Sequence, residues 1–300
     1  MSDTARLIER AERLLEQFER LLPQMKAPDW TAAVAWRWRR RESAFGVHGE
    51  LQGVSSLSSI SLDDLQNIGD QKELIERNTR QFVAGLPANN VLLTGSRGTG
   101  KSSMIKALLN EFSEQGLRLI EVDKSDLVDL GDIVEMVSTR PERFIIFCDD
   151  LSFEEGEAGY KALKSVLDGS VAAQSDNVLV YATSNRRHLM PEYMKENLSA
   201  RHQSDGEIHP GETVEEKISL SERFGLWVAF YPFRQDDYLA VVAHWLTHFG
   251  CPADAIEAAR GDALRFALER GSRSGRVAWQ FARDYAGQHG IRAPGLRTGT

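Results

Sequence analysis

The sequence is poor in cysteine and has no long apolar run. Two cysteines in 300 residues, Cys148 and Cys251, do not make a disulfide framework, so we expect a reducing compartment. No apolar run approaches the roughly 18 residues that a membrane-spanning helix needs. The first residues, MSDTARLIERAE, are charged throughout and do not form a secretory signal. We therefore expect a cytoplasmic protein with no membrane partner.

An excess of basic residues is also lacking. The chain has 36 Lys and Arg against 44 Asp and Glu, a formal net charge of −8. This weighs against nucleic acid as the main ligand, because a phosphate-binding surface needs positive charge, but it leaves room for a local basic patch. A hydrophobic content of 42% excludes a disordered chain and allows a substantial core.

Five short apolar runs alternate with helix-length segments in the middle of the chain. The runs are rich in Val, Ile, Leu or aromatic residues without polar alternation, as expected of strands covered on both faces. Alternation with helices predicts a parallel sheet in a three-layer α/β domain. The runs are NNVLLTG (89–95), LRLIEVD (117–123), RFIIFCDD (143–150), NVLVYATSN (177–185) and LWVAFYP (226–232).

Different patterns flank these strands. Residues 4–22 place apolar side chains at helical spacing and predict an amphipathic helix, which Pro23 ends. Residues 46–60 are rich in Gly and Ser and read as a linker or irregular arm. After Pro232 no strand pattern follows. Three consecutive helices are predicted, over 236–250, 253–271 and 274–287.

A cluster of two tryptophans and four arginines, residues 36–41, lies between the first helix and this arm. Its tryptophans and arginines could stack on bases and neutralise phosphates. Alternatively, Trp36 and Trp38 are buried against the body of the protein and the arginines stay in water. We favour the second, structural interpretation.

The loop after the first apolar run, residues 95–102, matches G-x-x-x-x-G-K-[ST] between a predicted strand and a predicted helix. Its glycines allow backbone N–H groups to point inward at an anion, and the following helix adds its N-terminal dipole. Lys101 is expected to reach the β and γ phosphates, and Ser102 to bind Mg²⁺. A glycine-rich turn without a ligand is the alternative, and the strand–helix setting disfavours it. The predicted nucleotide-binding residues are Gly95, Ser96, Arg97, Gly98, Thr99, Gly100, Lys101, Ser102 and Ser103.

Polar side chains end two later strands. Asp149 and Asp150 follow RFIIFC, and Asn185 ends the next run. We expect Asp149 to bind Mg²⁺, often through water, and Asp150 to orient or deprotonate the attacking water. Asn185 would lie beside the γ-phosphate and help to position that water. Each residue alone is also an ordinary turn residue, but their order after a phosphate loop favours the catalytic interpretation.

These elements and the three C-terminal helices resemble the AAA+ class of P-loop ATPases. The chain also looks like a bacterial family of ATP-binding proteins named only as a domain of unknown function. The matching stretches are residues 62–103, FIIFCDDLSFE, ATSNRRHLMPE and EEKISLSERFGLWVAFYPF, and the resemblance covers about residues 30 to 285.

The resemblance implies further roles. Asp149 becomes the Walker B acid and Asn185 the sensor-1 residue. Arg223 matches a finger that reaches the γ-phosphate of a neighbouring subunit, and Arg276 matches sensor 2. Ile68 and Gly69 match the segment that packs on adenine.

The implied architecture is a five-stranded parallel sheet in the order 5-1-4-3-2 with a small helical lid and an N-terminal helical and basic arm. The implied domains are the arm at 1–60, the nucleotide-binding core at 61–235 and the lid at 236–300.

Two features depart from the AAA+ pattern. Asp150 stands where glutamate is usual, so either hydrolysis is slow or Glu154 or Glu155 contributes. The segment DKSDLVDLGD (123–132) has no aromatic residue where protein-threading rings carry a pore loop, which argues against an unfoldase.

Other arginines are alternative candidates for the two roles in which an arginine contacts the phosphates. Arg186 and Arg187 are rivals to Arg223, and Arg273 is a rival to Arg276. His202 and His209 are expected to be solvated rather than bound to a metal.

We expect an ATPase that uses ATP and Mg²⁺ to drive assembly or remodelling of a partner protein, as a homo-oligomeric ring or partial ring. A nucleotide-gated binding module or nucleic-acid loader with little hydrolysis is one alternative. A P-loop phosphotransferase is another. A GTPase is disfavoured because no N-K-x-D motif occurs.

Overall fold

The structure is a computed structural model that describes residues 10, 12, 13, 28–43, 46–153, 157–169, 175–185 and 220–291. Almost all of the helix predicted over residues 4–22 lies outside the described residues. The same holds for Glu154, Glu155, Arg186, Arg187, His202 and His209.

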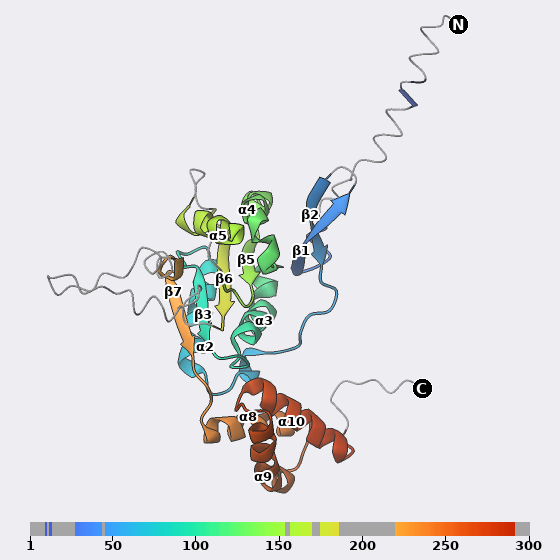
Figure 1. The fold of residues 1–300 in the computed structure, drawn as a ribbon, viewed down its shortest axis with the longest axis vertical. Coiled ribbons are helices and arrows are strands. Elements are labelled where there is room, and N and C mark those ends of the chain that lie inside the picture. The colour runs from blue at the N-terminus through green and yellow to red at the C-terminus, as the bar shows by residue number, and fades with distance from the viewer. Residues whose placement is uncertain are drawn as a thin grey trace, which may run out of the picture.

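The centre of the fold is a seven-stranded sheet in the order β2-β1-β4-β5-β6-β3-β7 (Figure 1). All five predicted apolar runs form strands in it. Among the strands that the structure describes, β1 and β2 are antiparallel and the other neighbouring strands are parallel. The strands are β1 (Ala35–Ser43), β2 (Gly46–Gly53), β3 (Val91–Gly95), β4 (Leu117–Glu121), β5 (Arg143–Cys148), β6 (Val178–Ser184) and β7 (Leu226–Phe230).

The prediction of a five-stranded sheet is wrong, because a hairpin extends the sheet beyond β4. Residues 46–53, read as part of a linker or irregular arm, form the edge strand β2, and β1 pairs in parallel with β4 through Trp36 and Ile120. The physical reason is the alternation of tryptophan and arginine in β1, a period of two that suits a strand with unlike faces. The remaining strands follow as β4-β5-β6-β3-β7.

The hairpin buries its tryptophans and neutralises its arginines. Trp36 and Trp38 are 2% and 3% exposed, and the Trp38 Nε1–H donates to Asp129 Oδ2 at 2.9 Å. The structural interpretation of these tryptophans holds, and they are not available to stack on bases. The arginine side chains remain 37% to 57% exposed, as expected, and each also pairs with a carboxylate. The ion pairs are Arg37–Glu121 at 2.6 Å, Arg39–Asp123 at 2.8 Å, Arg40–Asp129 at 3.3 Å and Arg41–Glu50 at 2.7 Å.

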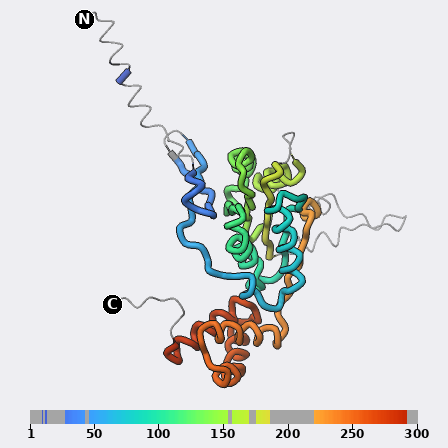
Figure 2. The backbone as a smooth tube through the Cα atoms, turned by 180° about the vertical axis from the view of Figure 1, so that it is seen from behind, coloured from blue at the N-terminus to red at the C-terminus, as the bar shows by residue number. Residues whose placement is uncertain are grey.

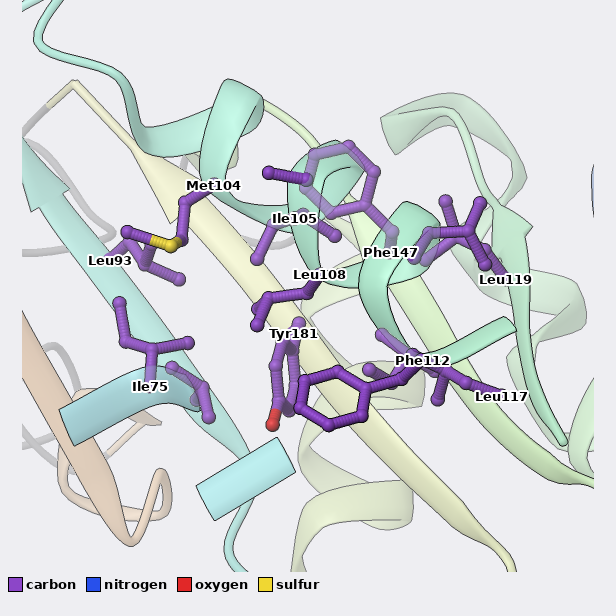
Figure 3. Packing of buried hydrophobic residues seen from close by; sticks show 14 of the residues in the cluster. Ile75, Leu93, Met104, Ile105, Leu108, Phe112, Leu117, Leu119, Phe147 and Tyr181 are labelled. Carbon is purple, nitrogen blue, oxygen red and sulfur yellow. The ribbon is translucent and has the colours of Figure 1, made fainter. Parts of the chain in front are cut away.

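Two layers of helices cover the sheet, as predicted for a three-layer domain. Helices α2 (Gly69–Val83) and α3 (Lys101–Phe112) pack on one face, and α4 (Leu130–Ser138) and α5 (Ala158–Asp168) on the other. Figure 3 shows the first face, where Ile75, Met104 and Leu108 surround Leu93 and Tyr181. Successive strand residues point to opposite faces, so Leu92 belongs to the second core and Leu93 to the first. Short 3₁₀ helices lie at Leu62–Asp64, Ser113–Gln115 and Lys124–Asp129.

The three predicted C-terminal helices form a lid with its own core. They are α8 (Gln235–His248), α9 (Ala253–Glu269) and α10 (Gly275–Gln288). Seen from behind in Figure 2, the lid lies below the sheet. It is tied to the segment before α2, because His244 Nε2 lies 3.1 Å from Asp64 Oδ1 and the Asn67 side chain donates to the carbonyl of Asp237 at 2.9 Å.

Cys148 and Cys251 are both free and buried, in agreement with the expected absence of a disulfide framework. Across the described residues, none of the helices has the length and apolar character that crossing a bilayer demands.

Candidate nucleotide-binding site

The loop of residues 95–102 joins β3 to α3 and packs tightly against its surroundings. Gly95 has φ of 133°, and a Cβ atom there would lie 1.9 Å from the carbonyl oxygen of Phe230 on β7. Gly98 has φ of 78°, and a Cβ there would lie 2.8 Å from Ser274 Oγ. Both positions therefore need glycine, for conformation and for space. The result is a compact loop held between β7 and the lid.

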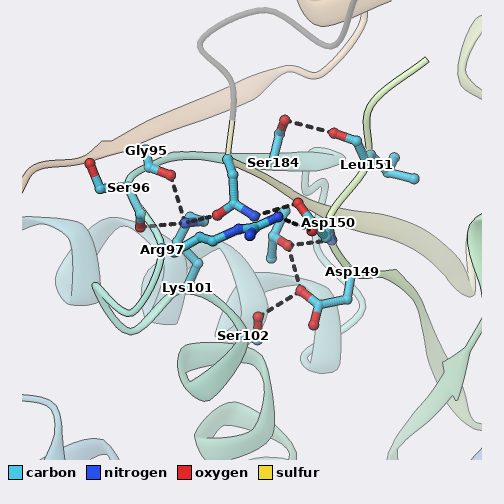
Figure 4. A network of polar contacts seen from close by, with 11 residues as sticks. Gly95, Ser96, Arg97, Lys101, Ser102, Asp149, Asp150, Leu151 and Ser184 are labelled. Atoms are coloured by element: carbon cyan, nitrogen blue, oxygen red, sulfur yellow. Dashed lines mark hydrogen bonds and ion pairs between the residues drawn. The ribbon is translucent and has the colours of Figure 1, made fainter. Parts of the chain in front are cut away.

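Lys101 lies in the centre of this loop. Its Nζ donates to the carbonyl oxygens of Gly95 and Ser96, both at 2.8 Å, and to Asn185 Oδ1 at 3.1 Å (Figure 4). Burial lowers the pKa of its ammonium group, although Asp149 and Asp150 oppose this shift. The structure thus places a buried cation where the sequence predicts a phosphate contact. A phosphate oxygen is a stronger partner for an ammonium group than a neutral carbonyl.

Asp149 and Ser102 meet directly. The Ser102 hydroxyl donates to Asp149 Oδ1 at 2.6 Å, although the two residues are far apart in the sequence. A hydroxyl and a carboxylate are hard oxygen donors of the kind that Mg²⁺ prefers beside phosphates. The pair therefore fits the predicted metal site, and a glycine-lined anion loop lies next to it.

Asp150 directly follows Asp149 after β5, and its carboxylate contacts the side chains of Asn185 and Arg97. Its backbone is left-handed, with φ of 54°. The Asn185 side-chain amide donates to Asp150 Oδ1, and Arg97 Nη2 lies 3.4 Å from Asp150 Oδ2. Because the carbonyl of the same Asn185 amide accepts from Lys101, one side chain connects the loop cation to the candidate base.

The lid contributes Arg276. A Cβ atom at Gly98 would lie 3.3 Å from Arg276 Cβ, and the positive charge of Arg276 helps to lower the pKa of Lys101. Ser274 caps α10 by accepting from the Val277 N–H at 3.3 Å, which places the start of this helix against the loop. The structure thus brings the predicted sensor-2 residue to the phosphate loop. The side chains of Arg276 and of its rival Arg273 are both exposed.

Ile68, which directly precedes Gly69, lies beside Gly100 of the loop. Ile68 is buried, and its Cδ1 would lie 3.5 Å from a Cβ at Gly100. Gly69 begins α2. This position suits a contact with the base of a nucleotide whose phosphates occupy the loop.

Arg223 has a different partner. Its Nε–H donates to Asp168 Oδ1, at the end of α5. The sequence did not indicate Asp168, because an ion pair between segments 55 residues apart leaves no local pattern.

Thr183 is the residue at the centre of the site that the sequence analysis missed. Its hydroxyl donates to Asp149 Oδ1 at 2.5 Å and accepts from the Asp150 N–H at 2.9 Å. The sequence did contain a signal that could have indicated Thr183. Its hydroxyl lies two residues before Asn185, on a strand predicted to end beside Asp149 and Asp150.

The fold and the site together define a P-loop nucleotide-binding protein of the AAA+ type: a sheet of this order, a phosphate loop, two acids on a neighbouring strand and a helical lid. The chain belongs to the family described as "Protein of unknown function (DUF815)", whose model matches residues 31–289.

Similar proteins were found by sequence and by structure. The large subunit of replication factor C from Sulfolobus acidocaldarius is 27% identical over 114 residues, which is 36% of this chain and 26% of that protein. The chain therefore spans only about a quarter of this relative. A chain of the HORMA:CdnC:Trip13 complex of E. coli MS115-1 is similar with 12% identity and a TM-score of 0.47, over 74% of this chain and 90% of that chain. A mutant of RuvB from Thermotoga maritima has 16% identity and a TM-score of 0.49, over 78% of this chain and 68% of that chain.

Proposed function

We propose that the protein binds ATP with Mg²⁺ at residues 95–103 and hydrolyses it to drive the assembly or remodelling of a partner protein. The observation that carries this proposal is the meeting of four polar groups from three separate segments. Lys101 and Ser102 come from the loop, Asp149 from the end of β5, and Asn185 from the end of β6. Clustering of a cation, a hydroxyl, a carboxylate and an amide at the carboxyl ends of parallel strands suits a triphosphate.

Each group has a role in this proposal. Lys101 and the loop N–H groups hold the β and γ phosphates, and Ser102 and Asp149 hold the metal. When bound, Mg²⁺ neutralises charge on the phosphates. Asp150 accepts the proton of the attacking water, and Asn185 positions that water.

The lid and the segment before α2 would complete the nucleotide pocket. Ile68 and Gly69 would pack on adenine, and Arg276 would contact the phosphates from the start of α10. Arg276 lies against Gly98 and Ile68 against Gly100, so the loop has a cationic neighbour suited to the phosphates and an apolar neighbour suited to the base.

The proposal favours hydrolysis over nucleic-acid loading or phosphotransfer. The arginines of β1 are paired with carboxylates, so the hairpin does not offer a free basic surface. A phosphotransferase would need a second substrate, whereas an ATPase releases phosphate with no added acceptor.

We expect phosphate release from ATP and Mg²⁺ alone, and we expect Lys101→Ala to weaken ATP binding about tenfold or more, because a charged hydrogen-bond donor to the phosphates is lost. Titration with a fluorescent ATP analogue and a phosphate-release assay measure the two quantities. Lys106→Ala, an exposed lysine on the same helix, is the matched control and should behave as wild type. Unchanged ATP affinity and turnover in Lys101→Ala would refute the assignment.

A further inference from the structure

Thr183 connects the two acids of the site. It lies on β6, is 1% exposed, and is followed two positions later by Asn185. Its hydroxyl proton goes to Asp149 Oδ1, and its oxygen accepts the Asp150 N–H. Figure 4 shows the Asp149 carboxylate turned toward Ser102 and the Asp150 carboxylate turned toward Arg97 within the polar network. A single buried hydroxyl thus holds a side chain of one acid and the backbone of the next.

One of the two hydrogen bonds of Thr183 constrains a side chain, and the other constrains the backbone. The bond to Asp149 Oδ1 fixes the rotation of a carboxylate that also faces Ser102. The bond from the Asp150 N–H supports a left-handed backbone, which a non-glycine residue adopts only at a cost. The Leu151 N–H reinforces this turn by donating to the carbonyl of Thr183 at 2.7 Å.

The hydroxyl is not needed to pair the strands. The register of β5 with β6 ends at Cys148 and Ala182, one residue before Asp149 and Thr183. Backbone hydrogen bonds already join the strands up to that point. The Thr183 hydroxyl therefore forms its hydrogen bonds past the last β5–β6 backbone pair, and both partners are residues of the site.

We propose that Thr183 is a positioning residue for the metal site: it holds the Asp149 carboxylate in the orientation that, with Ser102, binds Mg²⁺, and it places Asp150 at the side of Asn185. This inference rests on the proposed function. Ser102 is itself expected to turn to the metal, which leaves the Thr183 hydroxyl as a donor that keeps Asp149 in place. Hydrogen bonds to metal-binding carboxylates orient them and tune their affinity.

The test compares Thr183→Val, which keeps the shape and removes the hydroxyl, with Thr183→Ser, which keeps the hydroxyl. Binding of a fluorescent ATP analogue is titrated with Mg²⁺ and repeated in EDTA. We expect Thr183→Val to need about tenfold more Mg²⁺ for half-maximal binding, in line with losses of outer hydrogen bonds at metal sites. Binding in EDTA should be unchanged, because Lys101 and the loop remain. Thr183→Ser should restore the wild-type Mg²⁺ dependence.

Thr79→Val is the matched control. Thr79 is also fully buried, and its hydroxyl contacts Ile75 and Tyr181 in the core rather than the site. The Thr79→Val substitution should lower thermal stability without changing the Mg²⁺ dependence of ATP-analogue binding. If Thr183→Val folds poorly, Thr183→Cys supplies a weaker donor of similar size, and its Mg²⁺ requirement should lie between those of Thr183→Ser and Thr183→Val.

Two outcomes overturn the inference and can be told apart. If wild type binds ATP with Mg²⁺ and Lys101→Ala does not, but the valine and cysteine variants keep the wild-type Mg²⁺ dependence, Thr183 has no positioning role. If wild type shows no binding of ATP with Mg²⁺ at all, the proposed function is wrong and the inference falls with it.

Discussion

At the scale of single residues, Asp150 is a position where this chain departs from the pattern it resembles. Aspartate is one methylene shorter than glutamate, yet the left-handed backbone at φ of 54° brings its carboxylate to the Asn185 amide. Arg97 lies at the other carboxylate oxygen. Both contacts compete with water for the carboxylate, so under the proposed function we expect slow hydrolysis until a nucleotide draws Arg97 or Asn185 away.

Replacement of Asp150 by Asn is expected to retain ATP binding and lose turnover about 100-fold or more, since the charge that activates water is removed. Asn adopts the left-handed region readily, so the fold should persist. Analogue binding and phosphate release measure the two effects. Asp132→Asn, at an exposed position on α4, is the control. Intact turnover in Asp150→Asn, together with its loss in Glu154→Gln, would show that the base has been assigned to the wrong residue.

At the scale of secondary-structure elements, the phosphate loop depends on β7 as well as on β3 and α3. Strands β3 and β7 pair in parallel, and the last pair in their register is Gly95 with Phe230. The approach of the Phe230 carbonyl leaves no room for a side chain on the first residue of the loop. The conformation of the phosphate loop and the edge strand β7 are therefore physically linked.

Gly95→Ala should reduce both stability and ATP binding, and Gly116→Ala separates the two causes. Gly116 also has a positive φ, of 96°, but a Cβ there meets nothing within 4 Å. Gly116→Ala should therefore show conformational strain alone, about 1–2 kcal/mol. Gly95→Ala adds the clash with Phe230 and should lower the free energy of unfolding by more. Thermal and urea unfolding with analogue binding test this. Equal effects of the two substitutions, with normal ATP affinity, would contradict it.

At the scale of the whole molecule, the lid and the sheet meet around the loop. His244 contacts Asp64, the Asn67 side chain contacts the backbone of Asp237, and Ser274 contacts the loop at Gly98. A nucleotide held by the loop and by Arg276 would thus respond to the position of the lid. In the proposed ring, Arg223 acts outside its own subunit, and in the single chain its guanidinium pairs with Asp168.

We expect ATP-dependent assembly in which Arg223 completes the site of a neighbour. An arginine supplied across an interface can contribute roughly 10³ to 10⁵ in rate, because it neutralises charge that develops on the γ-phosphate. Turnover per subunit should rise with protein concentration, and added Arg223→Ala subunits should inhibit wild type. Analytical ultracentrifugation with and without ATP, paired with this mixing assay, provides the measurement.

Arg260→Ala, on the exposed side of α9, is the control for the mixing assay and should not inhibit. A monomer at every concentration, with turnover independent of concentration and of Arg223, would rule out the ring. A monomeric switch driven by nucleotide would then be the better account.

The sequence alone determined the elements whose signals are local. Continuous apolar runs identified β3 to β7, the G-x-x-x-x-G-K-[ST] pattern located Lys101 and Ser102, and polar residues at strand ends indicated Asp149, Asp150 and Asn185. These signals are local because burial on both faces and the curl of a glycine loop depend on neighbouring residues.

Only the tertiary structure decided which distant segments meet. The hairpin joins β4 because Trp36 and Trp38 are buried there and Glu121 and Asp123 neutralise its arginines, more than 80 residues along the chain. Thr183 reaches Asp149 through the register of two parallel strands. The start of α10 reaches the loop through a contact between Ser274 and Gly98. Such contacts depend on the packing of the whole core, because no stretch of neighbouring residues encodes the register of strands or the docking of a lid.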